Sequence, residues 1–274
     1  MKPKKTNKIL LLVFFTGLSL LLYPTVSDYW NSFHQTRAIA GYREAVAELD
    51  ENTYEEHRTQ AQAYNRELIG DRGRFQPDEE ESTRYQELLD ITGSGIMGYI
   101  EIPSINVSLP IYHGVEDSVL QVAVGHIQGT SLPVGGTGTH CVLSGHRGLP
   151  SAKLFTDLDK LTDGDVFLLY VLDQVLTYEV DQIHIVEPQD VDLLEIQEGQ
   201  DLCTLVTCTP YGINSQRLLV RGHRIENQKT ESDAYITTDA VQIEPVLVAS
   251  IAAALVLSVL LICLFISSRK KKRR

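Results

Sequence analysis

The sequence is poor in cysteine and lacks the closely spaced cysteine and histidine pairs of structural zinc sites. Its four cysteines are Cys141, Cys203, Cys208 and Cys263. Because Cys263 lies inside an apolar C-terminal segment, three remain elsewhere, and an odd number indicates at least one free thiol rather than a disulfide framework. We therefore expect neither a metal nor any other cofactor.

Basic residues are scarce between the two ends of the chain. Of the 24 Lys and Arg residues, 4 precede Ile9 and 6 follow Ser268, so 14 remain beside all 36 Asp and Glu residues and the central region has a formal charge of −22. Such a surface repels anionic polymers. Nucleic acid is therefore not an expected partner.

Long apolar runs are absent except near the two ends. The first, Ile9–Tyr23, is short for a membrane span and follows four lysines, an order typical of a signal peptide or signal anchor. The second, Val246–Ile266, has 21 residues without a charge. As a helix it would span about 31 Å, which matches a hydrocarbon core of about 30 Å.

The basic residues near the ends flank the outer side of both apolar segments. Lysines precede the first segment, and residues 269–274, all basic, follow the second. By the positive-inside rule, both tails are expected in the cytoplasm and the region between them outside the cell. The cell membrane is the expected location, and the lipid bilayer is an expected partner.

Two compositions divide the region between these segments. Residues 29–95 are rich in Ala, Glu, Gln and Arg, with apolar residues at mostly helical intervals, which predicts one or two helices. From Ile96 to Ile225, short β-type runs alternate with turn residues and no regular helices intervene, which favours a mainly β fold, a closed barrel or a sandwich. The expected organisation is a tail 1–8, a membrane segment 9–23, a helical region 29–95, a β domain 96–225, a linker 226–245, a membrane helix 246–266 and a basic tail 267–274.

Cys208 differs from the other cysteines by its position. Cys141 and Cys203 each lie inside an apolar run, where a reduced thiol packs as a small apolar side chain, whereas Cys208 is followed by Thr-Pro-Tyr-Gly at the end of its run. Since proline cannot continue a central strand, this thiol is expected at a strand end, within reach of substrate. A thiol with an ordinary pKa of about 8.5 needs a neighbouring base or cation to act as a nucleophile.

Two residues could supply that help. His146 follows a β-type run in a Gly-His-Arg-Gly turn, a strand end like that of Cys208, although a histidine there can also be a plain turn residue. Arg217 opens the next run nine residues after Cys208, so a strand, a turn and a strand would return it beside the thiol. Its planar fork of donors suits an oxyanion, and the alternative is a surface ion pair.

The segments TLVTCTPYG, NSQRLLVRGHR and LSGHRGLPSAKLFTDL resemble those of the sortases, membrane-anchored cysteine transpeptidases of Gram-positive bacteria. The order His, Cys, Arg is that of sortases, whereas papain-like proteases place Cys before His. The segments GIMGYIEIPSINVSLPIYHG and GHIQGTSLPVGGTGTH, with the apolar and basic C-terminus, resemble class C, the pilin-polymerising branch. This resemblance implies an eight-stranded β-barrel with His146 as catalytic histidine, Cys208 as nucleophile and Arg217 as catalytic arginine.

The resemblance also implies the reaction. The Cys208 thiolate would attack the Thr–Gly carbonyl of an LPxTG-like sorting signal, Arg217 would stabilise the oxyanion, and His146 would protonate the leaving amine. A lysine amine of the next pilin subunit would resolve the thioester, so pilin subunits are the implied partners. Cys208 and His146 could start either as thiolate and imidazolium or as a neutral pair.

Two other functions fit parts of the sequence. A housekeeping sortase that attaches proteins to peptidoglycan would share the site, but the long helical N-terminal region and the C-terminal anchor argue against it. A non-enzymatic, wall-anchored surface protein would also end in an apolar segment and a basic tail. The residues before Val246, TTDAVQIEP, contain no LPxTG-like element, which argues against the surface protein.

The resemblance fails at one motif. Relatives in this branch commonly cover the site with a lid that carries an Asp-Pro-aromatic tripeptide, and none occurs between Leu68 and Ile91. Asp71 and Phe75 are the candidate substitutes, with Asp71 expected opposite Arg217 and Phe75 in the pocket of Cys208. Without the usual anchors, the lid-like segment of about 70–95 is expected to be only loosely held, and the alternative is an ordinary lid that is anchored by different residues.

Overall fold

The structure is a computed structural model that describes residues 3–227 and Ser258. The chain forms two units, and all eight strands belong to the unit Trp30–Gln228. Apart from Ser258, the expected C-terminal span 246–266, its basic tail and most of the linker lie outside the described residues. The fold is therefore described for the β domain and the helices that precede it.

Helix α1 (Pro3–Ala47) contains the N-terminal apolar segment. Within the part of the chain that the structure describes, one helix, Leu11–Ala47, is long and apolar enough to cross a membrane by length and composition alone. The C-terminal turns of α1 pack on the β domain, where the Tyr42 hydroxyl donates to the carbonyl of Met97 (3.1 Å) and accepts from the N–H of Leu172 (2.8 Å). These bonds join α1 to strand β1 (Ile96–Ile102) and to the residue that follows strand β5 (Val166–Val171).

Two more helices follow, so residues 29–95 hold three helical stretches where one or two were expected. Helix α2 (Glu51–Glu67) begins at Asp50, whose carboxylate accepts from the N–H of Thr53. Helix α3 (Glu79–Glu87) begins with a capping box in which Asp78 and Glu81 each accept from the other's backbone N–H. The caps explain the additional breaks, since each one starts a new helix.

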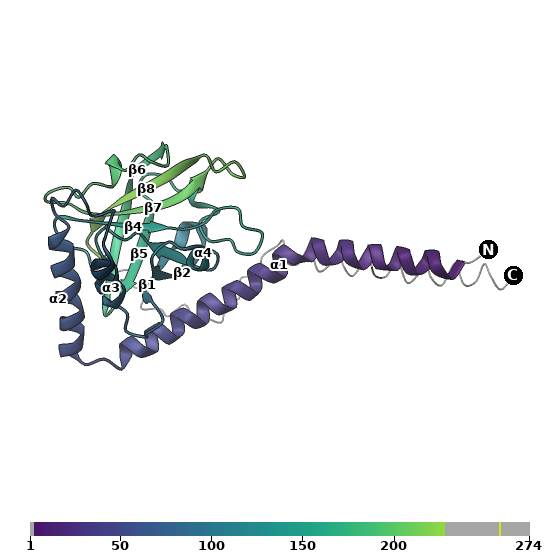
Figure 1. The fold of residues 1–274 in the computed structure, drawn as a ribbon, viewed down its shortest axis with the longest axis horizontal. Helices are drawn as coiled ribbons and strands as arrows, with labels where there is room; N and C mark the ends of the chain where they lie inside the picture. Colours follow the sequence, from purple (N-terminus) through teal and green to yellow (C-terminus); the bar gives the residue numbers. More distant parts are fainter. Residues whose placement is uncertain (1–2, 228–257, 259–274) are drawn as a thin grey trace. The chain divides into compact units, whose positions relative to one another are not determined.

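Eight strands close into a barrel, as expected, in the order β1-β2-β3-β4-β7-β8-β6-β5 (Figure 1). They are β1 (Ile96–Ile102), β2 (Val107–His113), β3 (Val124–His126), β4 (Thr139–Ser144), β5 (Val166–Val171), β6 (Gln174–Val186), β7 (Asp201–Thr209) and β8 (Gln216–Ile225). Short helices lie in the connections: η1 (Pro103–Ile105), α4 (Asp117–Leu120), η2 (Leu158–Lys160) and η3 (Asp192–Leu194). The pairs β2/β3 and β4/β7 are parallel and the other pairs are antiparallel.

Alternation along β4, β7 and β8 separates two apolar clusters. The main core of the barrel includes Leu143, Leu205 and Val220 from these strands. A second cluster on the opposite face contains Val142, Val206, Leu219 and, from η3, Leu194. Because side chains alternate along a strand, residues two positions from Val206 and Leu219 share this outer face.

Candidate active site

Cys208 and Arg217 lie directly opposite each other on neighbouring strands. They are register partners near the turn between β7 and β8, and each is two residues from a member of the outer apolar cluster, Val206 or Leu219. Both are half-buried. The hairpin thus brings the expected thiol and guanidinium to one edge of the outer face.

His146 reaches the same level from the other side of β7. Strand β4 runs parallel to β7 with Ser144 opposite Val206, and the ladder continues as Gly145 donates its N–H to the Val206 carbonyl (3.0 Å). Continuing this register by two residues places His146 level with Cys208. Since β4, β7 and β8 run side by side (Figure 1), the turn after β4 that carries His146 lies at the same end of the sheet as the Cys208–Arg217 pair, and these three residues are called the row.

The turn that carries His146 is held by short-range packing and by β7. The Thr207 hydroxyl donates to the Gly145 carbonyl (2.8 Å), and Phe155 donates its N–H to the His146 carbonyl (3.1 Å). A Cβ atom at Gly145 would come within 2.6 Å of the Phe155 ring, so only glycine lets the turn approach so closely. Gly145, Phe155 and Thr207 therefore fix the backbone of the turn at His146.

The guanidinium of Arg217 is bound to its own turn rather than to an acid. Its Nη1 donates to the carbonyls of Asn214 (3.3 Å) and Gln216 (3.1 Å). Among the residues that the structure describes, no carboxylate forms an ion pair with Arg217, so the surface ion pair considered from the sequence is not formed there. The positive charge of Arg217 therefore has no carboxylate partner among the described residues and is available to a ligand at the row.

Arg147 belongs to the surroundings of this row and was not singled out from the sequence. Its side chain is 9% exposed, is paired with Asp159 of η2, and lies with Nη1 3.5 Å from the Thr209 hydroxyl. Its guanidinium also lies over the Tyr211 ring, 5.8 Å from the centroid. Arg147 therefore joins the turn after His146 to the end of β7. In the sequence, only its position next to His146 pointed to this role.

Farther along the outer face, His140 is a structural residue. Its Nδ1 lies 2.9 Å from the carbonyl of Glu195 and its Nε2 lies 2.8 Å from the Thr204 hydroxyl, so a neutral ring that donates from Nδ1 and accepts at Nε2 satisfies both partners. Burial lowers its pKa to about 4. Within the described residues no group of histidines, cysteines and carboxylates is arranged to hold a metal ion.

No hydrogen bond, ion pair or ring contact joins either lid candidate to the row in the described chain, so their expected places remain a prediction. The Asp71 carboxylate accepts from the N–H of Gly73 (2.7 Å), and no ion pair joins it to Arg217 in the described chain. Phe75 lies against Gly129 and under the Arg74 guanidinium, which is 4.6 Å from the ring centroid. Neither candidate is placed by these contacts at the thiol.

Arg74, between the two candidates, anchors this segment instead. Its side chain is only 3% exposed, donates from Nη2 to the Leu194 carbonyl (3.2 Å) and pairs with Glu195 (3.3 Å). The sequence does not reveal this role because arginine is rarely buried and its partners lie 120 residues away. The segment is therefore attached to η3, on the same outer face as the row.

The rest of the lid-like segment also contacts the barrel, as in the alternative of a lid anchored by different residues. Tyr85 of α3 is 1% exposed, donates from its hydroxyl to the His126 carbonyl (3.1 Å) and accepts from the N–H of Gly114 (3.1 Å). Leu89 is fully buried in the main core. The missing tripeptide was a poor guide because apolar and aromatic burial, not one motif, holds α3 to the barrel.

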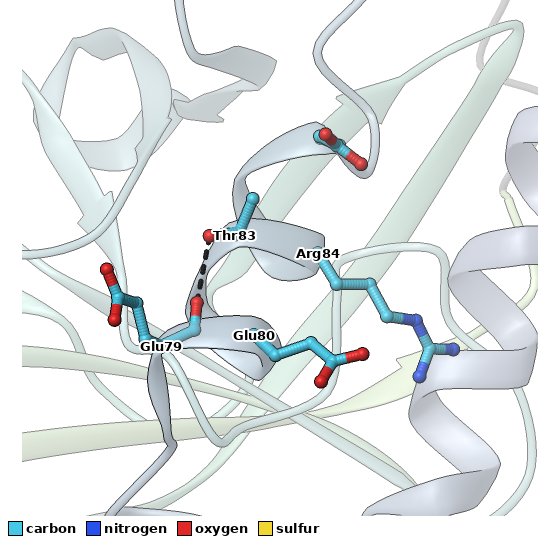
Figure 2. A pocket seen from close by; sticks show the side chains of 5 residues that line it. Glu79, Glu80, Thr83 and Arg84 are labelled. Atoms are coloured by element: carbon cyan, nitrogen blue, oxygen red, sulfur yellow. Dashed lines mark hydrogen bonds between the residues drawn. The ribbon is translucent and has the colours of Figure 1, made fainter.

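A surface hollow on α3 does not belong to this site. Figure 2 shows that it is formed by one helix alone, and it is lined by Glu79, Glu80, Thr83, Arg84 and Glu87. Its hydrogen bond from the Thr83 hydroxyl to the Glu79 carbonyl (2.8 Å) is local to the helix. It brings together neither a thiol nor a histidine, so the row on β4, β7 and β8 remains the candidate site.

Known proteins resemble the chain over this whole domain. A sortase domain model matches residues 100–225. Sortase C1 from Streptococcus agalactiae is 48% identical, with 70% of this chain and 99% of that chain covered and a TM-score of 0.67. Sortase C of Streptococcus pneumoniae is 46% identical, with 70% and 97% covered and a TM-score of 0.62.

More distant relatives extend the comparison. Sortase D of Bacillus subtilis is 31% identical over 131 residues, which are 47% of this chain and 63% of that protein. Sortase A of Bacillus anthracis is 27% identical over 81% of this chain and 95% of that protein. Identity is thus higher to the class C structures than to the A and D relatives.

Proposed function

The chain belongs to the sortase family of cysteine transpeptidases, in class C, and we propose that it joins pilin subunits into a covalent polymer at the outer face of the cell membrane. The observation that supports the proposal is the pairing of Cys208 with Arg217 on β7 and β8, with His146 one residue beyond the Gly145 bond to Val206 in the turn after β4. The substrate is an LPxTG-like sorting signal, cleaved between Thr and Gly.

Cys208 is the nucleophile of the proposed reaction. Its sulfur attacks the threonine carbonyl carbon, and the carbonyl electron pair moves to oxygen, where the guanidinium of Arg217 stabilises the negative charge. When the C–N bond breaks, His146 gives a proton to the leaving glycine amine. The product is a thioester between Cys208 and the threonine.

The second half of the reaction regenerates the thiol. A lysine amine of another pilin subunit attacks the thioester, its excess proton passes to His146, and the sulfur leaves as the C–S bond breaks. An amide then joins the two subunits. Because one side chain acts first as acid and then as base, His146 must stay level with Cys208 in both steps, which the ladder between Gly145 and Val206 supports.

The proposed topology places this domain outside the cell. Helix α1 supplies an apolar segment of suitable length and composition, preceded by lysines. With the second apolar segment 246–266 and its basic tail, both termini are cytoplasmic in this proposal. Peptidoglycan anchoring by a housekeeping sortase is the less supported function, because identity to class C structures, 41–48%, exceeds the 27% identity to Bacillus anthracis sortase A.

Trapping the thioester tests the proposal directly. The full chain is incubated with peptides that carry sorting signals of candidate pilins, and the Cys208 peptide is analysed by mass spectrometry. We expect the mass of the acyl fragment that ends at threonine on Cys208, and its transfer when a pilin domain with reactive lysines is added. Transfer only to peptidoglycan-type amines would favour the housekeeping function, and acylation at another residue would overturn the assigned nucleophile.

A further inference from the structure

Helix α1 carries an exposed group of aromatic rings that its contacts with the domain leave uncovered. Trp30 is 63% exposed and Phe33 is 56% exposed. Both rings lie next to the ring of His34, with centroids 4.9 and 5.8 Å away. These three residues are called the aromatic patch. Large apolar side chains in one exposed group indicate an interaction surface.

The opposite side of the same helix is the one bound to the β domain. The Asn31 amide donates to the Ser151 carbonyl (2.8 Å), and the Gln35 amide donates to the Val122 carbonyl (2.7 Å). With 3.6 residues per turn, Trp30 and Phe33 point roughly 120° to 180° away from the side that carries Asn31 and Gln35. The patch therefore faces away from the domain, and the domain is not its partner.

The sequence before the patch indicates what covers it. Between Lys8 and Asp28 there are 19 residues without a charged side chain. As a helix they span about 28 Å, close to a hydrocarbon core of about 30 Å, and the headgroup layer beyond adds roughly 5–7 Å, or three to five residues. Trp30 falls within that layer and Phe33 at its outer edge.

Tryptophan in particular is enriched in this layer, because its ring is apolar while its N–H can bind water and headgroups. We propose that the aromatic patch is seated in the headgroup layer of the outer membrane surface, and that the Asn31–Ser151 contact thereby holds the loop after His146 at the bilayer. The inference rests on the membrane anchoring proposed above, not on the transpeptidation.

This placement has a consequence for substrate. Ser151 belongs to the connection between β4 and β5 that starts with the His146 turn. A loop held at headgroup level favours sorting signals that are themselves presented at the membrane surface, and it disfavours segments far from the bilayer. The patch would thus favour membrane-tethered chains over soluble ones.

Trp30 is the only tryptophan of the chain, so its fluorescence reports on the patch directly. The full chain is inserted into phosphatidylcholine–phosphatidylglycerol vesicles, and emission is measured with iodide in the water and with lipids brominated near the headgroup or deep in the acyl chain. A matched control, Trp30→Phe with Arg37→Trp, moves the indole seven residues along the same side of the helix, about 10 Å. Arg37 is exposed and lies outside the proposed site.

We expect the wild-type indole to be quenched most by the shallow bromine and to have an iodide quenching constant several-fold lower than that of the control. Equal iodide quenching in the two proteins would overturn the placement. Strongest quenching by the deep bromine would also overturn it, because the indole would then lie in the hydrocarbon. Failure of the chain to float with the vesicles would refute the anchoring on which the inference depends.

The fluorescence measures position and not turnover, so it is independent of the thioester experiment. A chain that is quenched as expected but forms no thioester would refute the proposed function and leave the inference intact. A second variant, Phe33→Asp, tests the substrate consequence. It should lower the rate with vesicle-tethered sorting signals several-fold and leave the rate with soluble peptide unchanged. Equal effects on both substrates would contradict the membrane role.

Discussion

The row at the strand ends can be compared with a second set of residues of the same chemical types in the body of the same sheet. The row is His146, Cys208 and Arg217, and the second set is His140, Cys203 and Arg221. The first set is half-buried, and the second is buried or ion-paired within the protein. Residue type therefore does not decide which groups are available for chemistry; position along the strand and choice of face do.

The two cysteines of β7 show the effect of face. Cys203 is fully buried inside the barrel beside its register partner Cys141, and burial raises the pKa of its thiol well above the ordinary value. Cys208, five residues later, lies on the outer face at the strand end. An inward thiol has no access to substrate, and its thiolate is disfavoured.

The two arginines of β8 show the effect of partners. Arg221 forms two hydrogen bonds to Asp181, from Nε (3.0 Å) and Nη2 (2.7 Å). Arg217 contacts only backbone carbonyls among the interactions that the structure describes. A bidentate carboxylate occupies the fork of the first arginine, whereas carbonyls leave the charge of the second uncompensated.

The largest expected effect separates the two cysteines. Cys208→Ala should lower thioester formation by about a thousandfold or more, because the nucleophile is lost. Cys203→Ala should keep most of the activity and lower the free energy of unfolding by about 1 kcal/mol, a typical cost for a buried change. Rates of acylation and urea unfolding of both variants measure this. Loss of activity in a folded Cys203→Ala protein would contradict the conclusion that only the outward-facing cysteine of β7 is available for the reaction.

A smaller effect should separate the two arginines. Arg217→Lys should lower the acylation rate about a hundredfold, since an ammonium keeps the charge but not the planar fork that binds the oxyanion. Arg221→Lys is the matched control, and it should change the rate little while it weakens the pair with Asp181. Steady-state kinetics with one sorting peptide compares them. A control that loses as much activity as Arg217→Lys would show that a guanidinium is needed at either position of β8, so that the place of Arg217 opposite Cys208 is not what matters.

The smallest expected effect concerns pH and His140. Its pKa in the folded protein, about 4, lies below that of an unfolded histidine, about 6.5, so the unfolded state binds more protons between these values. The free energy of unfolding should therefore fall by up to about 3 kcal/mol as the pH is lowered from about 6.5 to about 4.

His140→Gln removes this titration and should flatten the pH dependence of stability over that window. Urea unfolding of the wild type and the variant at several pH values provides the measurement, and the difference between the two slopes isolates His140 from the carboxylates. Parallel curves for the two proteins would contradict the assignment of a buried neutral ring.

The sequence by itself predicted a mainly β fold, a barrel or a sandwich, and its resemblance to sortases selected the eight-stranded barrel and the members of the row. Period-2 apolar runs, turn residues and the order His, Cys, Arg are local properties, and strand pairing follows from them once the family resemblance is recognised. Cys208 and Arg217 are nine positions apart in one hairpin, so its register was within reach of sequence reasoning. The two caps that divide the helical region, Asp50 and Asp78, were not predicted from the sequence.

Only the tertiary structure decided which charged residues are buried. Arg74 is covered because Leu194 and Glu195 supply a carbonyl and a carboxylate from 120 residues away, and Arg147 because Asp159 and Thr209 meet it at the barrel end. A charged side chain is exposed by default, and it is buried only where distant partners compensate for the lost water. No local sequence pattern encodes such distant partners. The role of Arg74 in attaching the lid-like segment to the outer face could therefore be assigned only from the tertiary structure.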